Sequence, residues 1–194
     1  ANLNGAKNID INAGTVDATV AQTILSASNT GITDINKVVG KTAEIKALSL
    51  GINDTIATIE VSDTTSIADA TSIVALDLDG NGFEKSDITN PIVFTKITGS
   101  AADIIAGKAV AALATAVEVT GTVTVAEAIT LQANDRVGGS SKNYTYSISG
   151  TSTELLDDND VNGTVNADSA VEDATEVTVT DNVTVAQATK IVAI

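Results

Sequence analysis

Thr184-Val185-Ala186-Gln187 is one of four copies of a short phrase that recurs along this chain. Each copy has a hydroxyl residue, an apolar residue, Ala, and then Gln, Glu or Asp; the others are Thr19-Val20-Ala21-Gln22, Ser66-Ile67-Ala68-Asp69 and Thr124-Val125-Ala126-Glu127. This spacing is typical of a capping box, in which two side chains bond the free amides at the start of a helix. The phrase therefore predicts four helices, each of which begins at its hydroxyl residue.

Alternating strands precede the last three copies, and apolar helical stripes follow them. The strands are Ile59-Glu60-Val61, Val117-Glu118-Val119 and Val177-Thr178-Val179. Such alternation is typical of a half-buried strand. After the phrase, apolar residues such as Val125, Ala128 and Ile129 recur at helical intervals. We call this strand and helix an A segment, and we expect its Ala residues, such as Ala126, to let the helix pack close to its neighbour.

A second kind of segment, which we call B, occurs twice. Residues Ile97–Ile105 match Ile148–Leu156: each has a strand end, a Gly, a hydroxyl residue at the expected N-cap, and an acidic residue three positions later. A and B segments alternate from residue 59 to the end of the chain. Residues 1–56 resemble degenerate copies, with Ile9-Asp10-Ile11 before the first A helix and one or two further segments between Ile32 and Leu50.

The alternation predicts an α/β fold: a repetitive, solenoid-like stack of short parallel strands and short helices. Residues 1–56 would form degenerate N-terminal coils and residues 57–194 the regular repeats, as two parts or as one continuous domain. The alternative is an all-β sandwich of short strands. The capped, Ala-containing helices favour the α/β stack.

Composition excludes several classes of function. The net charge is −15, so the chain lacks the basic footprint of a protein that binds nucleic acid or an anionic membrane surface. It has no Cys and no His, which excludes disulfides and a Ser–His–Asp triad. No apolar run approaches the roughly 18 residues that a membrane-spanning helix needs. We therefore expect no enzymatic activity, no nucleic-acid partner and no membrane insertion.

Two acidic loops, residues 77–87 and 158–168, share one pattern and predict calcium sites. Calcium prefers six to eight oxygen ligands, which alternate Asp and Asn side chains and a backbone carbonyl on a tight Gly-containing loop can supply. The predicted ligands are Asp77, Asp79, Asn81, Phe83, Asp87, Asp158, Asp160, Asn162, Thr164 and Asp168, with Phe83 and Thr164 acting through their carbonyls. The loops resemble those of EF-hand and dockerin-type modules, although the closing acid comes one position early and no Glu stands in the bidentate position. The alternative is that Asp, Asn and Gly here simply form turns.

The stretches Val177–Ala188 and Tyr146–Thr151 resemble repeats of large bacterial secreted surface proteins, including S-layer-like proteins and RTX-type adhesins exported by type I secretion. The resemblance covers residues 57–194, and the glycine-rich nonapeptide of RTX β-rolls is absent. It implies an extracellular location, calcium-dependent folding or assembly, and a structural or adhesive role. We expect a calcium-stabilised structural segment of a longer surface-layer, filament or matrix protein that associates with itself. The alternative is an adhesin module that binds a glycan or a partner protein.

Overall fold

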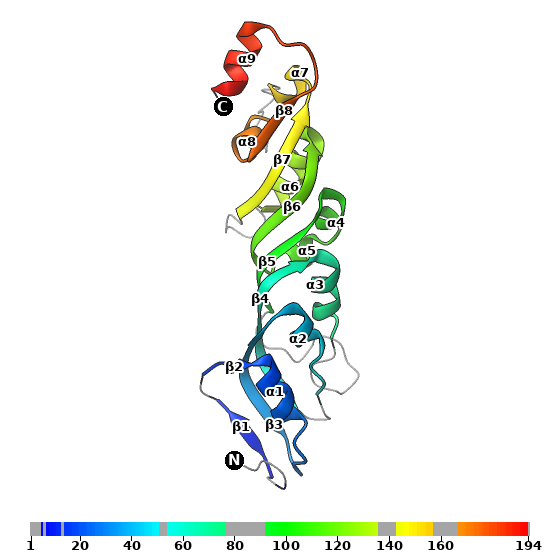
Figure 1. Cartoon of the computed structure of the whole chain (residues 1–194), viewed down its shortest axis with the longest axis vertical. Coiled ribbons are helices and arrows are strands. Elements are labelled where there is room, and N and C mark those ends of the chain that lie inside the picture. Colours follow the sequence, from blue (N-terminus) through cyan, green and yellow to red (C-terminus); the bar gives the residue numbers. More distant parts are fainter. Residues whose placement is uncertain are drawn as a thin grey trace. The chain divides into compact units, whose positions relative to one another are not determined.

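Strands and helices alternate along the chain (Figure 1). The computed structural model describes residues 5, 7–12, 14–50, 54–76, 92–135, 143–156 and 167–193. The elements of the first half are β1 (Ile9–Ile11), β2 (Val16–Asp17), α1 (Ala18–Leu25), β3 (Thr33–Gly40), α2 (Thr42–Lys46), β4 (Thr55–Ser66) and α3 (Ile67–Val74). Those of the second half are β5 (Val93–Ser100), α4 (Ala101–Ala106), α5 (Lys108–Ala111), β6 (Ala114–Thr124), α6 (Val125–Asp135), β7 (Asn143–Gly150), α7 (Ser152–Leu155), α8 (Ala167–Glu172), β8 (Glu176–Val179) and α9 (Val185–Val192).

The strands pair in parallel, as expected when helices connect them. The strand order is β1-β3-β4-β5-β6-β7-β8, and β2 also pairs with β3. Parallel register is seen for β1 and β2 on β3, for β3 on β4, and for β6 and β8 on β7. The fold is therefore α/β with an open parallel sheet, and the alternative of an all-β sandwich is wrong.

The contacts divide the chain into two compact units. The first consists of Ala1–Ile97 and Leu113–Thr115, and the second of Thr98–Ala112 and Ala116–Ile194, so β5 and β6 contribute residues to both. In the first unit α1 packs on β3, α3 packs on β4, and α2 lies against α1 and α3. In the second unit α6 packs on β7 and lies against α4 and α8, and α7 lies against α8 and α9.

Each unit has a mainly aliphatic core between its strands and its helices. In the first unit the core residues are Ile35, Val38, Ile45, Ile59, Val61 and Ile73. In the second they are Val117, Leu131, Tyr146, Ile148 and Leu155. Aliphatic side chains therefore fill most of each core, as the low aromatic content predicts, although aromatic rings are buried as well, Phe94 in the first unit and Tyr146 in the second.

The helix starts largely confirm the predicted caps. The hydroxyl oxygens of Ser66, Thr124 and Thr184 accept hydrogen bonds from the amides of Asp69, Glu127 and Gln187, at 3.0, 3.3 and 3.3 Å. In the B segments the hydroxyls of Ser100 and Thr151 accept from the amides of Asp103 and Glu154, at 3.2 and 3.3 Å. These five helices begin where the sequence predicts because each cap satisfies amides that the helix leaves free.

The first copy of the phrase is a correction. Thr19 was predicted to be the N-cap, but α1 begins at Ala18 and its N-cap is Asp17. The Asp17 carboxylate accepts a hydrogen bond from the Thr19 amide at 2.9 Å. Asp is at least as good a cap as Thr, so the acidic residue two positions upstream takes the role.

The place of the small residues is a second correction. Ala68 and Ala126, which the phrase shares, are exposed, and Ala186 is exposed as well. In these two helices the Ala two positions later packs instead, since Ala70 and Ala128 are completely buried, while in the first copy the Ala of the phrase, Ala21, is itself completely buried. Two positions along a helix correspond to a rotation of about 200°, so when one of these Ala residues faces the core the other faces away from it.

The region Ile32–Leu50 holds one further segment of the B kind. Gly40 ends β3, Lys41 is the N-cap of α2, and the Glu44 carboxylate accepts a hydrogen bond from the Lys41 amide at 2.7 Å. The sequence pattern expects a hydroxyl residue at the N-cap, and Lys41 has none. Of the two side chains in the pattern, only the acidic one, Glu44, is therefore present. The absent hydroxyl is why the sequence pattern placed this segment only loosely.

Candidate functional site

Two glycines lie where one segment meets the next. Gly40 and Gly150 each stand directly before the N-cap of a B helix and close to the first residue of the preceding A helix. A Cβ atom at Gly150 would lie 2.7 Å from Val125 Cγ2, and one at Gly40 would overlap Ala18 Cβ. Glycine is therefore needed at both positions because any side chain would force the two segments apart.

Two sets of part-buried hydrogen bonds connect the start of a B helix to an Asp of the following A segment. We call each set a tie. Thr42, the first residue of α2, donates through its amide and its hydroxyl to Asp63, each at 2.8 Å. Ser152, the first residue of α7, donates in the same way to Asp181, at 2.7 and 2.9 Å. Asp63 and Asp181 both stand three residues before the N-cap of the A helix that follows, so the two ties occupy equivalent positions. Both donors of Thr42 bond Asp63 Oδ1, whereas those of Ser152 bond the two oxygens of Asp181.

The remaining B and A pair in the second unit lacks both partners of this tie. The first residue of α4 is Ala101, and the residue three positions before the N-cap Thr124 is Gly121. Gly121 has φ +80°, and the register between β6 and β7 shifts between Glu118 and Thr122. Hydroxyl and Asp therefore occur together or not at all, a signal that sequence reasoning missed although both residues stand at fixed offsets.

Ion pairs add to these ties in the first unit. Lys37 on β3 bonds Glu60 on β4 at 2.6 Å, and Lys46 on α2 bonds Asp69 on α3 at 2.5 Å. The hydrogen bond from Lys46, and after it that from the Ser66 hydroxyl, lowers the pKa of Asp69. Both pairs are about a third or more exposed, so each contributes little to stability by itself.

Carboxylates at the helix starts have lowered pKa values because amides and hydroxyls donate to their charged forms. Hydrogen bonds from the Thr19 hydroxyl and amide lower the pKa of Asp17. The pKa of Glu154 is lowered chiefly by a hydrogen bond from the Thr151 amide, and the pKa of Asp181 chiefly by one from the Ser152 amide. These acids thus serve as ionised caps.

A buried polar cluster lies in the second unit. The Tyr146 hydroxyl donates to the carbonyl of Ala170 at 2.8 Å and accepts from Gln132 Nε2 at 3.1 Å. Gln132 also donates to Asp173. The cluster joins β7, α6 and α8, and because its hydroxyl and amide are paired, it is a structural tie.

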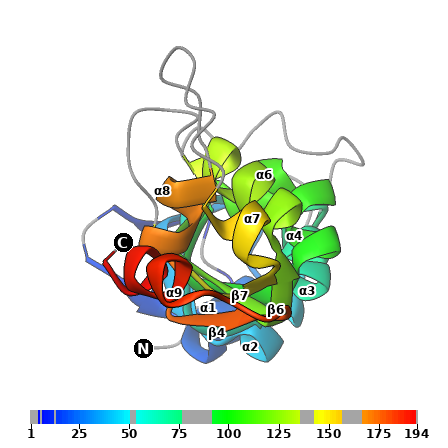
Figure 2. The ribbon, with the colours of Figure 1, turned by 90° about the horizontal axis from the view of Figure 1, so that it is seen from above.

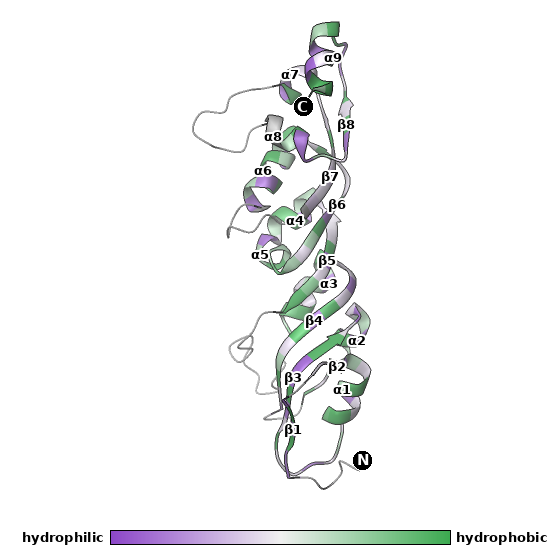
Figure 3. Ribbon diagram, turned by 90° about the vertical axis from the view of Figure 1, so that its left-hand side faces the viewer, coloured by the Kyte–Doolittle hydropathy of each residue, from purple (hydrophilic) through white to green (hydrophobic). Residues whose placement is uncertain are grey.

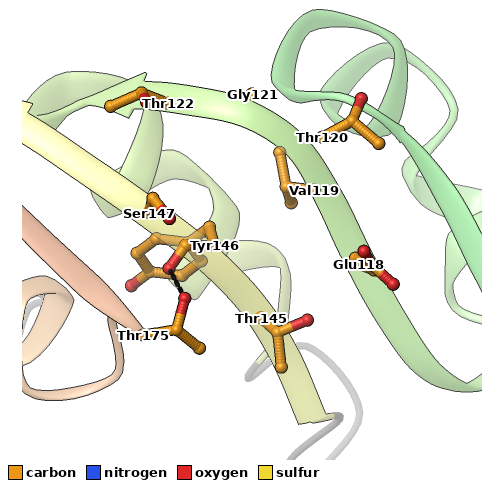
Figure 4. Close-up of a pocket in the computed structure, with 9 residues that line it drawn as sticks. All are labelled: Glu118, Val119, Thr120, Gly121, Thr122, Thr145, Tyr146, Ser147 and Thr175. Carbon is orange, nitrogen blue, oxygen red and sulfur yellow. Dashed lines mark hydrogen bonds between the residues drawn. The ribbon is translucent and has the colours of Figure 1, made fainter.

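The second unit also has an open groove of about 640 Å³ on β6 and β7 (Figure 4). Hydroxyl side chains dominate its lining, which consists of Glu118, Val119, Thr120, Gly121, Thr122, Thr145, Tyr146, Ser147 and Thr175. The Thr175 hydroxyl donates to the Tyr146 carbonyl at 2.9 Å. Glu118 is its single carboxylate, so the groove offers polar contacts to a ligand and no pair of acids for acid–base chemistry.

The predicted calcium ligands fall on parts of the chain that the structure does not describe. This applies to Asp77, Asp79, Asn81, Phe83, Asp87, Asp158, Asp160, Asn162 and Thr164. The backbone of Asp168 lies in α8, but its side chain is outside the described part. Elsewhere in the described ranges no three acidic side chains gather closely enough to hold a metal ion, and the two loops stay a prediction.

None of the helices within the described ranges is long and apolar enough to cross a membrane. Compared with known protein families, curated proteins and solved structures, the chain matches none of them.

Proposed function

We propose that this chain is a structural segment of an extracellular surface layer, filament or matrix, in which A and B segments stack as a solenoid and copies of the chain associate. The support is internal. Capped helix starts recur along the chain, a glycine lies at the closest approach of two segments, and in two pairs of segments a hydroxyl bonds Asp. Recurring contacts of this kind are typical of a scaffold, in which each segment buries its apolar face against its neighbours.

The paired occurrence of hydroxyl and Asp carries this proposal. Thr42 with Asp63 and Ser152 with Asp181 pair the same groups at equivalent positions in different units, while Ala101 and Gly121 stand where both partners are absent. Joint replacement is what a role in holding segments together predicts, because either partner alone would leave a polar group without its bond.

Calcium is the second part of the proposal. Nine acidic residues and no basic residue lie between Lys142 and Lys190, and such uncompensated charge opposes a compact state. Calcium bound by the loop 158–168 would reduce this repulsion, and the loop 77–87, which shares the same pattern, would hold a second ion. The resemblance of the repeats to secreted, calcium-dependent surface proteins also supports calcium binding, and an extracellular location is part of the proposal.

The test combines thermal unfolding with negative-stain microscopy of the whole chain in calcium, magnesium or EGTA. We expect calcium to raise the melting temperature, since an ion at a hundred times its Kd stabilises the folded state by about 2.7 kcal/mol. We also expect ordered assemblies in calcium. The matched control replaces Asp158 and Asp160 by Asn, which keeps loop length and size. Identical melting curves in calcium and EGTA would refute the calcium sites, and dispersed monomers in every condition would refute assembly.

The groove of β6 and β7 favours a second candidate, an adhesin module that binds a glycan. Its hydroxyl-rich lining and open form suit a polar ligand. The measurement is glycan-array binding of the chain and of Thr145→Trp, a change at an exposed position that would obstruct the groove. Binding that this variant abolishes would support the adhesin role, and absence of binding would leave only the structural role.

A further inference from the structure

The four A segments differ at one position, three residues before the N-cap of the helix. Glycine stands there in the first and third segments, as Gly14 and Gly121, and Asp stands there in the second and fourth, as Asp63 and Asp181. The two kinds of A segment therefore alternate along the chain. All four copies share the phrase at the start of the helix, so this position is what distinguishes one A segment from the next.

The two glycines adopt the same backbone conformation. Gly14 has φ +88° and Gly121 has φ +80°, which is the left-handed region that glycine enters at little cost. Apart from its chain neighbours, a Cβ atom at either position would meet no atom of the described residues within 4 Å. Glycine is therefore needed at both positions for its backbone conformation and not for lack of space.

The first glycine lies where the pairing of the strands shifts. From Ile11 to Val16 the chain advances five residues, while its partner β3 advances three residues, from Ile35 to Val38. Gly14 lies within this stretch of the first A segment, which thus has two more residues than the strand beside it. An excess of this kind is a β-bulge.

The second glycine lies in a shift of the same size. From Glu118 to Thr122 β6 advances four residues, while β7 advances two residues, from Thr145 to Ser147. After both shifts the register is the same, because the residue before the N-cap pairs with the residue two positions before the glycine that ends the partner strand. The open groove of the second unit lies along this bulge, whose residues form one side of its lining.

The two Asp residues connect to the segment before them. Each forms a tie with the first residue of the preceding B helix, Thr42 in one case and Ser152 in the other. The strands of these segments pair at a constant offset, and Figure 3 shows β3 beside β4. In both cases the glycine that ends the B strand pairs with the residue five positions before the next N-cap.

Each compact unit contains one run of segments with these features. The first unit holds β1, β2 and α1, followed by β3 and α2 and then by β4 and α3; the second holds most of β6 with α6, followed by β7 and α7 and then by β8 and α9. In both runs the glycine that ends the B strand lies against the first residue of the helix before it. Figure 2 shows α6 and α7 on the same side of β7. The equivalent residues Gly14 and Gly121, Thr42 and Ser152, and Asp63 and Asp181 are 107, 110 and 118 residues apart.

We infer that the structural repeat of this chain is a module of three segments in the order A, B, A, present once in each unit, and that the residue three positions before each A N-cap is a positioning residue. In the first A segment of a module it is glycine and sets the bulge against the B strand. In the last A segment it is Asp and holds the start of the B helix. The segment of β5 and α4, which connects the two modules in the sequence, cannot make this tie because Ala101 has no hydroxyl and Gly121 has no carboxylate.

The first test is amide hydrogen exchange of the whole chain, measured residue by residue by NMR spectroscopy. Asp181→Ala should speed exchange of the Ser152 amide by about tenfold and leave the Thr42 amide within about twofold of the parent. Asp63→Ala should have the reverse effect. Asn182→Ala, an exposed neighbour of Asp181, is the matched control and should change neither amide.

The second test concerns the backbone conformation at the two glycines. Gly14→Ala and Gly121→Ala each place a side chain in the left-handed region, whereas Asn enters this region more readily and is the conservative replacement. We expect each Ala variant to speed amide exchange in its own strand pair, β2 on β3 or β6 on β7, by about tenfold. Gly14→Asn and Gly121→Asn should restore most of the protection, which a merely space-filling role of glycine would not predict.

Cross-strand NMR contacts in the parent chain give a measurement that needs no variant to fold. The inference requires an excess of two residues at both glycines, seen from which residues lie opposite each other before and after each shift. A different excess at the two glycines would overturn the inference. Equal exchange in the Ala and Asn variants, or an effect of Asp63→Ala on the Ser152 amide as large as that on Thr42, would also overturn it.

The inference goes beyond the proposed function, because it concerns how segments join within one molecule. None of these measurements needs calcium, a ligand or assembly. Dispersed monomers in microscopy, together with the expected exchange results, would contradict only the proposed assembly. Ordered assemblies of a chain whose two ties respond to the same single variant would contradict only the module.

Discussion

Helices α6 and α9 have almost the same beginning and opposite surroundings. Thr124-Val125-Ala126-Glu127-Ala128 differs from Thr184-Val185-Ala186-Gln187-Ala188 only at the fourth residue. Both N-cap amides donate to the side chain three residues later, at 2.9 Å in each case. Yet α6 buries Val125, Ala128 and Leu131, whereas none of the equivalent residues of α9 is buried and Val185 is 85% exposed. The comparison teaches that the phrase encodes a helix start, while burial depends on which segment comes next.

The largest change in the free energy of unfolding is expected when a buried Ala of α6 is enlarged. Ala128→Leu should cost about 1–3 kcal/mol in the free energy of unfolding, because this side chain is completely buried and the core has no room for three more carbon atoms. Urea unfolding measures the cost. Ala126→Leu, on the exposed side of the same helix, is the matched control and should be nearly neutral. Equal costs for the two variants would mean that α6 is rotated from the position described.

A somewhat smaller effect is expected from shortening the first helical residue. Val125→Ala removes two buried methyl groups and should cost about 1.5 kcal/mol, at roughly 0.8 kcal/mol for each group. Val185→Ala, the same change at the exposed position, should stay within about 0.5 kcal/mol of the parent. If Val185→Ala is as destabilising as Val125→Ala in a monomeric chain, then another part of the chain covers α9.

The smallest effect concerns the pH dependence of the tie at Asp181. The Ser152 amide lowers the pKa of this carboxyl below its ordinary value of 3.8. A lowered pKa in the folded state adds stability that is complete above pH 3.8 and is lost as the pH falls through the folded-state value. The difference in melting temperature between the parent and Asp181→Asn should therefore be largest near neutral pH and shrink below pH 4.

The control for this experiment is contained in the difference itself. Acid also neutralises other carboxylates and relieves repulsion among them, but it does so in the parent and in Asp181→Asn alike. A difference that stays constant from pH 7 to pH 3 would show that the carboxylate charge plays no part in holding Ser152.

Several features of the fold could be predicted because they depend on residues close together in the sequence. The caps at Ser66, Thr124 and Thr184 were predictable since both capping partners are three residues apart. The start of α1 was not, because Asp17 and Thr19 are both good caps and only the structure decides between them. The calcium sites stay a prediction, because the loops that would form them lie almost wholly outside the described residues.

The contacts that join segments could not be read from local spacing. Thr42 and Asp63 are 21 residues apart, Ser152 and Asp181 are 29 apart, and Gln132 and Asp173 are 41 apart. Their meeting depends on how the parallel strands align, which sets the partners of a helix start. For the same reason the groove beside Gly121 has no sequence signal beyond a glycine within a strand.

The amino-acid sequence by itself determined that strands and capped helices alternate, because hydrogen bonds at a helix start and the alternation along a strand involve neighbours in the chain. Only the tertiary structure decided which copy of the apolar stripe is buried, and it placed Val125 under Gly150 while it left Val185 exposed. Burial requires a second surface, and the residues that supply that surface lie a whole segment away.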